Sequence, residues 1–144
     1  MPGCREYERW WVNPDTGEGR CIDKNLTDEW LLRLNRLRIL RLKSICEGHL
    51  DADNFSQKNT PDISLELTER FENQSERISA EIASMKNTEP EIEFAYGHSE
   101  FEPKAFFLNL KCKRKRCSTE LEPWVTNWFQ RVIELVQSID SRSG

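Results

Sequence analysis

Alternation of apolar and polar residues in three separate segments is the feature that most constrains the fold. Residues 62–67 ("DISLEL"), 91–96 ("EIEFAY") and 105–111 ("AFFLNLK") all alternate in this way. A period of two places apolar side chains on one face of a β-strand, so each segment indicates a strand with one buried face. Residues 40–46 ("LRLKSIC") alternate less regularly, and we interpret them as a fourth strand.

Segments with helical spacing separate these strands. Apolar residues recur every three to four positions in 27–38, 68–86 and 119–139. Thr119 and Glu122 stand in the spacing of a capping box at the start of the last helix. The order helix, strand, strand therefore occurs twice before a final helix. This order predicts an α+β fold with a mainly antiparallel sheet, helices packed on one face, and an internal helix-strand-strand repeat.

The two ends of the chain carry weaker signals. Residues 1–24 alternate on both sides of the turn-forming stretch "NPDTGEG", which predicts a β-hairpin or an extended arm. Residues 140–144 are expected to form a frayed tail. The 144 residues contain no linker-like segment, so we expect one domain over 1–144.

Composition and charge favour a soluble protein of the cytoplasm. The net charge of -4 gives no overall attraction to nucleic acid or to anionic membranes. The apolar runs are only a few residues long, too short for a transmembrane helix, and the first residues lack the basic and apolar regions of a signal peptide. In a reducing cytosol all five cysteines are expected to be free thiols: Cys4, Cys21, Cys46, Cys112 and Cys117.

The first candidate site is the stretch Cys46-Glu47-Gly48-His49, at the end of the strand predicted for 40–46. The other histidine, His98, also follows a glycine at a predicted strand end. If the two turns converge, Cys46, His49 and His98 supply three ligands for zinc, with Glu47 as a base. Without a metal, Cys46, Glu47 and His49 are candidate catalytic residues, because a histidine near a carboxylate transfers protons and can activate a thiol.

An alternative interpretation of the same stretch needs no chemistry. Gly48 and Gly97 would permit turns with positive φ, and His49 and His98 would be exposed turn residues. The distance between the two histidines decides between these interpretations.

The motif also carries a resemblance to known families. Residues 44–49, "SICEGH", resemble the Ser-x-Cys-Glu-Gly-His pattern of small, largely uncharacterised microbial and phage proteins. They are more distantly similar to the Ser-Ser-Cys-Ser-Gly-Arg motif of the wybutosine-synthesising protein 3 family, which modifies tRNA with S-adenosylmethionine. The resemblance covers residues 27–67 and implies a helix and a strand before the motif, then a loop and a strand. Ile45, Glu47 and His49 depart from the second motif, so methyl transfer is not carried over.

The second candidate site is the basic run "KCKRKRC". Such a cluster can neutralise several phosphates, and aromatic side chains on the strand before it can stack on unpaired bases, which predicts RNA contact without catalysis. The alternative is a solvated turn balanced by nearby acidic residues. The candidate nucleic-acid-binding residues are Lys111, Lys113, Arg114, Lys115 and Arg116.

Two further observations concern partners and enzyme class. Adjacent Trp10 and Trp11 point to opposite sides of a strand, so one of them is exposed unless a partner covers it, and a homodimer would do so. The chain has no P-loop, GxGxxG, GxSxG or HExxH motif, which argues against the common nucleotide hydrolases, dehydrogenases, serine hydrolases and zincins. Whether the chain is an enzyme stays open at this level.

Overall fold

A computed structural model describes residues 3–48, 59–101, 105–118 and 120–142, and it has the α+β fold that the sequence predicts. Within these residues, three α-helices, one short 3₁₀ helix and six strands follow one another. In order they are β1 (Glu8–Val12), β2 (Gly19–Asp23), α1 (Asp28–Asn35), β3 (Leu40–Cys46), β4 (Asp62–Leu67), η1 (Glu69–Gln74), α2 (Ser75–Thr88), β5 (Ile92–His98), β6 (Phe106–Cys112) and α3 (Pro123–Ser141).

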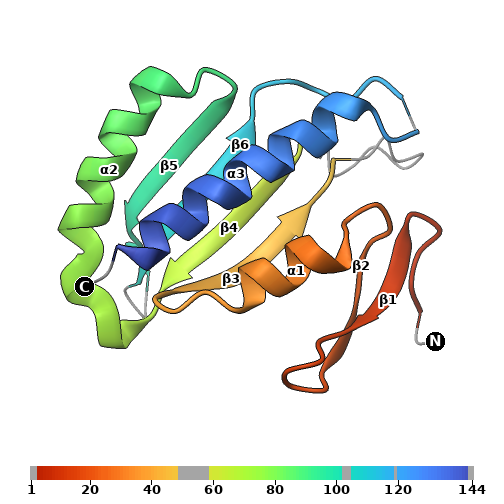
Figure 1. The fold of residues 1–144 in the computed structure, drawn as a ribbon, viewed down its shortest axis with the longest axis horizontal. Helices are drawn as coiled ribbons and strands as arrows, with labels where there is room; N and C mark the ends of the chain where they lie inside the picture. Colours follow the sequence, from red (N-terminus) through yellow and green to blue (C-terminus); the bar gives the residue numbers. More distant parts are fainter. Residues whose placement is uncertain (1–2, 49–58, 102–104, 119, 143–144) are drawn as a thin grey trace.

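Four strands form an antiparallel sheet in the order β3-β4-β6-β5. The long helix α3 crosses one face of this sheet, with α1 and α2 on either side of it (Figure 1). The hairpin β1–β2 forms a separate two-stranded sheet beside α1, as the alternation in residues 1–24 predicts. None of the described helices is long and apolar enough to cross a membrane.

The helix-strand-strand order occurs twice, in α1–β3–β4 and α2–β5–β6. The second strands of the two units, β4 and β6, pair with each other in the middle of the sheet. Because that pairing is antiparallel, the two hairpins point in opposite directions. Equivalent positions in the two units therefore lie at opposite corners of the sheet.

The core lies between the sheet and its helices, and the alternation explains it. On β4 and β6 every second side chain points toward α3 and is buried, while the residues between them are half-buried or exposed. Burying one such apolar side chain stabilises the fold by about 1.5–3 kcal/mol. The central members of the continuous core are Ile63, Leu65, Leu108, Leu110, Phe129, Val132 and Val136.

Helix boundaries differ from the prediction for identifiable reasons. The segment 69–74 is a 3₁₀ helix, and α2 begins only at Ser75. The last helix begins at Pro123, where a residue without an N–H is tolerated because first-turn N–H groups have no partner within the helix. Glu122 is its N-cap residue, so the capping box predicted from Thr119 does not start it; Thr119 itself lies outside the described residues.

The predicted frayed tail is wrong at its first residue. Asp140 belongs to α3 and is 5% exposed. Its carboxylate accepts hydrogen bonds from the backbone N–H groups of Arg38, Ile39 and Leu40, at 2.7, 2.8 and 3.1 Å. The N–H groups in the turn before β3 have no partner in the strand ladder, so they are free to donate to this carboxylate. The resulting charge-assisted bonds connect the end of α3 to the start of β3.

Two of the cysteines are not free thiols. Cys4 and Cys21 form a disulfide that ties the N-terminal segment to β2, whereas Cys46, Cys112 and Cys117 carry free thiols. The expectation of five free thiols, which assumed a reducing cytosol, is therefore wrong for this pair, which the β1–β2 hairpin brings together.

The tryptophans of β1 are both covered by their own chain. Trp11 is 6% exposed and belongs to the core. Trp10 is half-buried and lies over Gly19 on β2, where an added Cβ would meet the indole ring at 2.2 Å. Neither tryptophan of β1 is fully exposed, so the observation that suggested a homodimer is not present. The homodimer stays a prediction.

Replacing Asp140 tests the link between α3 and β3. Asp140→Ala removes the acceptor of three largely buried N–H groups, so we expect the free energy of unfolding to fall by ~3 kcal/mol in urea titrations. Glu134→Gln, on the exposed side of the same helix, is the matched control and should change it by less than about 0.5 kcal/mol. Equal effects of the two substitutions would contradict the role of Asp140.

Candidate functional site

The two sequence motifs meet at one end of the sheet. Cys46, the last residue of β3, pairs with Asp62 on β4, and Asp62 pairs with Lys111 near the end of β6. The Cys46-Glu47-Gly48 turn and the basic run after β6 are therefore neighbours, although they are far apart in sequence. The sequence suggested two rival sites, but the structure places them side by side.

A buried ion pair joins the two motifs directly. The Arg116 guanidinium lies 3.4 Å from the Glu47 carboxylate, and these side chains are only 2% and 3% exposed. The same Nη1 atom donates a hydrogen bond of 2.7 Å to the carbonyl oxygen of Gly48. Arg116 is thus not an exposed cation, and the expectation that the whole basic run is solvated is wrong for this residue.

The remaining donors of Arg116 hold the connection between β6 and α3. Its Nη2 atom donates to the carbonyl oxygens of Ser118 and Glu120, and its Nε lies 3.4 Å from the Glu122 carboxylate. The Arg116 backbone N–H donates to the carbonyl of Asn59, just before β4. We call this set of contacts the Arg116 cluster.

Glu47 is held from a third direction by the connection after β2. The Glu47 backbone N–H donates to Asp23 at 2.8 Å, and the Asn25 N–H reaches the Glu47 carboxylate at 3.4 Å. Burial raises the pKa of Glu47 above its ordinary value; Asp23 adds to this, while Asn25 and Arg116 oppose it. The carboxylate therefore has a structural role and is not presented to solvent as a base.

Cys46 is a poor candidate for a nucleophile. Burial, and secondarily the nearby Asp23 carboxylate, raises the pKa of Cys46 to about 12. The thiolate is the reactive form of cysteine, so this side chain stays an unreactive thiol at neutral pH. Its sulfur accepts a hydrogen bond of 3.4 Å from the Gly48 N–H, which closes the turn.

The structure does not bring His98 to Cys46. His98 ends β5, at the opposite corner of the sheet, so three strand spacings of about 4.8 Å each separate the two strands. His98 instead lies 3.7 Å from Glu72 and contacts the Phe106 ring. Two ligands of one zinc ion must both lie within about 2.3 Å of it, so Cys46 and His98 cannot share a metal.

The remaining parts of the metal-site prediction concern His49 and other possible metal ligands. His49 lies outside the described residues. Within the described part of the chain, no group of three or more His, Cys, Asp and Glu residues is arranged to hold a metal ion. Gly48 has a φ of +77° in the turn after β3, as the alternative interpretation predicts, whereas Gly97 has a φ of +151° but lies within β5 and pairs with Phe107, so no turn forms at Gly97 itself.

The rest of the basic run lies on the surface. Lys111, Lys113, Arg114 and Lys115 are all exposed. The last three form what we call the basic turn, 113–115, which is held on one side by β6 and on the other by Arg116. The Lys113 N–H donates to the carbonyl of Glu91, and the Arg114 guanidinium lies 4.5 Å from the centre of the Trp124 ring.

Beside the basic turn lies a hollow that sequence reasoning missed. It has a volume of about 420 Å³, within the range of small-ligand pockets. Of the two tryptophans on α3, Trp128 is 6% exposed and belongs to the core, but Trp124 stays partly accessible. We call it the Trp124 hollow; its lining is Glu89, Pro90, Glu91, Ile92, Cys112, Arg114, Trp124, Asn127, Trp128 and Arg131.

The pH dependence of stability tests the state of Glu47. A raised pKa means that the native protein keeps a proton which the unfolded chain releases above about pH 4.5, so this residue's contribution to stability falls as pH rises through its native pKa. We expect wild type to lose stability relative to Glu47→Gln as pH rises from 4 to 8 in urea titrations.

Glu89 is a control, because its contribution to stability should change with pH in the opposite direction. Its hydrogen bonds to Arg131 lower the pKa of Glu89, so its contribution is present above pH 4.5 and is lost as pH falls through the native pKa. Wild type should therefore gain stability relative to Glu89→Gln over the same rise in pH. The same trend in both variants would contradict the assignment for Glu47.

Alkylation rates test the state of Cys46. We expect iodoacetamide at pH 7.5 to modify exposed Cys117 at least ~10-fold faster than Cys46, whose pKa of about 12 leaves almost no thiolate. Peptide mass spectrometry after timed quenching measures both rates in one sample, and labelling in urea gives the rates without the fold. Rapid labelling of native Cys46 would restore it as a candidate nucleophile.

Comparison with known proteins adds no family to these observations. No protein-family model, curated protein or solved structure matches the chain. The resemblance of residues 44–49 to the Ser-x-Cys-Glu-Gly-His pattern therefore stays a prediction. What the chain does has to be inferred from its side chains and their arrangement.

Proposed function

We propose that the chain is a nucleic-acid contact module that binds single-stranded RNA through the basic turn and catalyses no reaction. The observation that carries the proposal is the run of three exposed cations, Lys113, Arg114 and Lys115, on a turn anchored at both ends. An anchored turn loses little conformational entropy when it binds, so its charges are partly preorganised for phosphates.

The charges of the basic turn are available to a ligand. Within the described residues, Lys43 is the only lysine in an ion pair, so Lys111, Lys113 and Lys115 form none there. Each phosphate that a lysine neutralises releases a condensed counterion, which favours binding at low salt. A single strand suits the site better than a duplex, because an unpaired base can reach the partly exposed Trp124 ring beside the turn.

The predicted site at Cys46 supports a catalytic or metal function less well. Glu47 is buried and belongs to the Arg116 cluster, Cys46 is half-buried with a thiol of raised pKa, and His98 lies at another corner. Charged groups used in this way are not free to bind a ligand without breaking the connection between β6 and α3.

The salt dependence of binding tests the proposal. With the three cations of the basic turn on phosphates, a plot of log K against log salt concentration should have a slope of about -2 for a short single-stranded RNA, from about -0.7 per phosphate. Lys113→Ala/Lys115→Ala should lower affinity at low salt and reduce the slope to about -0.7. Fluorescence anisotropy of a labelled octanucleotide measures both quantities.

A charge-matched control separates the basic turn from general electrostatics. Arg38→Ala/Arg70→Ala removes the same charge from exposed positions just before β3 and just after β4, at the opposite end of the sheet from the basic turn. This variant should bind nearly as wild type does. The proposal fails if wild type binds no oligonucleotide at low salt, or if the two double variants bind equally well.

A further inference from the structure

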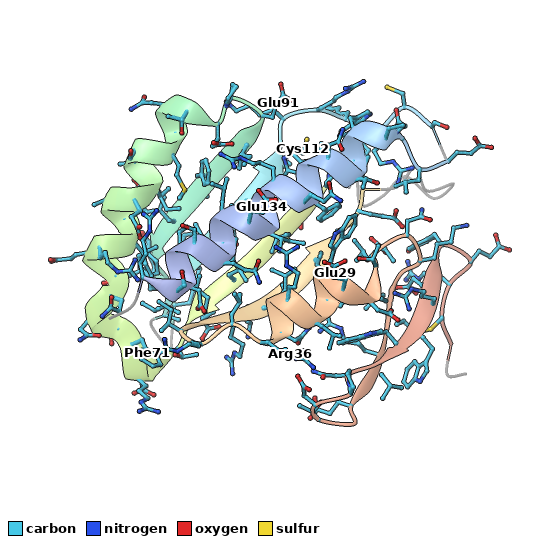
Figure 2. All side chains as sticks on the ribbon, in the orientation of Figure 1. Glu29, Arg36, Phe71, Glu91, Cys112 and Glu134 are labelled. Atoms are coloured by element: carbon cyan, nitrogen blue, oxygen red, sulfur yellow. A yellow bond between two sulfur atoms is a disulfide. The ribbon has the colours of Figure 1, made fainter. Side chains whose placement is uncertain are left out.

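The Trp124 hollow lies directly beside the basic turn, at the end of the sheet where β5 begins and β6 ends. Glu91 and Cys112 lie near each other beside α3 in Figure 2, and both line the hollow. Arg114 belongs to both features, since it is part of the basic turn and its guanidinium covers the Trp124 ring. A strand held by the turn would therefore pass the mouth of the hollow.

The walls of the hollow suit a flat aromatic ligand. The Arg114 guanidinium lies over the Trp124 indole, with its central carbon 4.5 Å from the ring centre. Nucleobases stack well on both arginine planes and tryptophan rings. Ile92, Cys112 and Trp128 are buried residues that add an apolar floor.

The polar groups around the hollow can read the edge of a base. Asn127 and Glu91 are both exposed and line it, and they offer an amide and a carboxylate. The other carboxylate, that of Glu89, is already held by Arg131 through bonds of 2.7 and 3.0 Å. Glu91 has a fixed backbone, because its carbonyl oxygen accepts bonds from the Trp128 indole and from the Lys113 N–H.

We propose that the Trp124 hollow binds one unpaired base of the RNA strand and prefers guanine. This inference rests on the proposed function, since the strand must be held by the basic turn. Guanine presents two adjacent donors, N1–H and the N2 amino group, to an acceptor-only carboxylate such as Glu91. Uracil presents one donor between two carbonyl oxygens, which the carboxylate repels.

The position of Glu91 also orients the strand. A carboxylate repels phosphate, so the backbone lies toward Lys113 and Lys115 while the base turns into the hollow. Glu91 weakens nonspecific binding because it repels phosphate, and the same repulsion contributes to the selection of the base.

Three octanucleotides test the inference: all-uridine, and the same strand with one central guanosine or one central inosine. Inosine keeps the N1–H of guanine but lacks its N2 amino group. We expect wild type to bind the guanosine strand ~10-fold more tightly than all-uridine RNA, with inosine in between. Glu91→Gln, which preserves the size of the side chain, should reduce the guanosine preference to within about twofold. Anisotropy titrations at one fixed low salt concentration provide these ratios.

Two further variants separate the hollow from the basic turn. Trp124→Leu should abolish the guanosine preference but retain the salt-dependent binding of all-uridine RNA. Lys113→Ala/Lys115→Ala should weaken all three strands by the same factor. Salt-dependent binding by wild type without a preference for guanosine would overturn the base site and leave the proposed function standing. Absence of binding to every strand would overturn the proposed function itself, and an unchanged preference in Glu91→Gln would overturn the role of Glu91.

Discussion

A guanidinium sealed from water needs a partner for each of its donors, and the charged end of this protein is organised around that requirement. Arg116 meets it with carbonyl oxygens and carboxylates from two separate connections, those after β3 and β6. Removing one partner of a buried ion pair costs about 3–5 kcal/mol, because the other charge is left without compensation. The geometry of the surface features nearby therefore depends on one arginine that has no access to solvent.

The same arginine explains why the basic turn is rigid enough to be a binding element. Three cations in sequence on a long loop would repel one another and sample many arrangements. Here the turn spans only 113–115 between the ladder of β6 and the Arg116 cluster, so its charges are held in one place. The Trp124 hollow has the same origin, because Arg114 can cover Trp124 only if the chain leaves β6 in this direction.

Sequence patterns predict what is local in this molecule and miss what depends on strand order. The strands at 62–67 and 105–111 were predictable because burying one face of a sheet dictates a period of two. No local pattern states that β4 pairs with β6, so the divergence of Cys46 and His98 could not be foreseen. The burial of Arg116 was hidden for a related reason: its partner Glu47 is 69 residues away, and a run of basic residues suggests solvent.

The free edges of the sheet have a consequence for aggregation. Edge strands expose unpaired N–H and C=O groups on which another chain can build a continuous sheet. On β3 the ladder is interrupted between Leu42 and Ser44, and the intervening Lys43 is exposed and charged. On the other edge, β5 carries exposed Glu93 and reaches Gly97 with a positive φ near its end. Irregular backbone and charge at both edges oppose the addition of a further strand. These features therefore oppose edge-to-edge aggregation of this protein at high concentration.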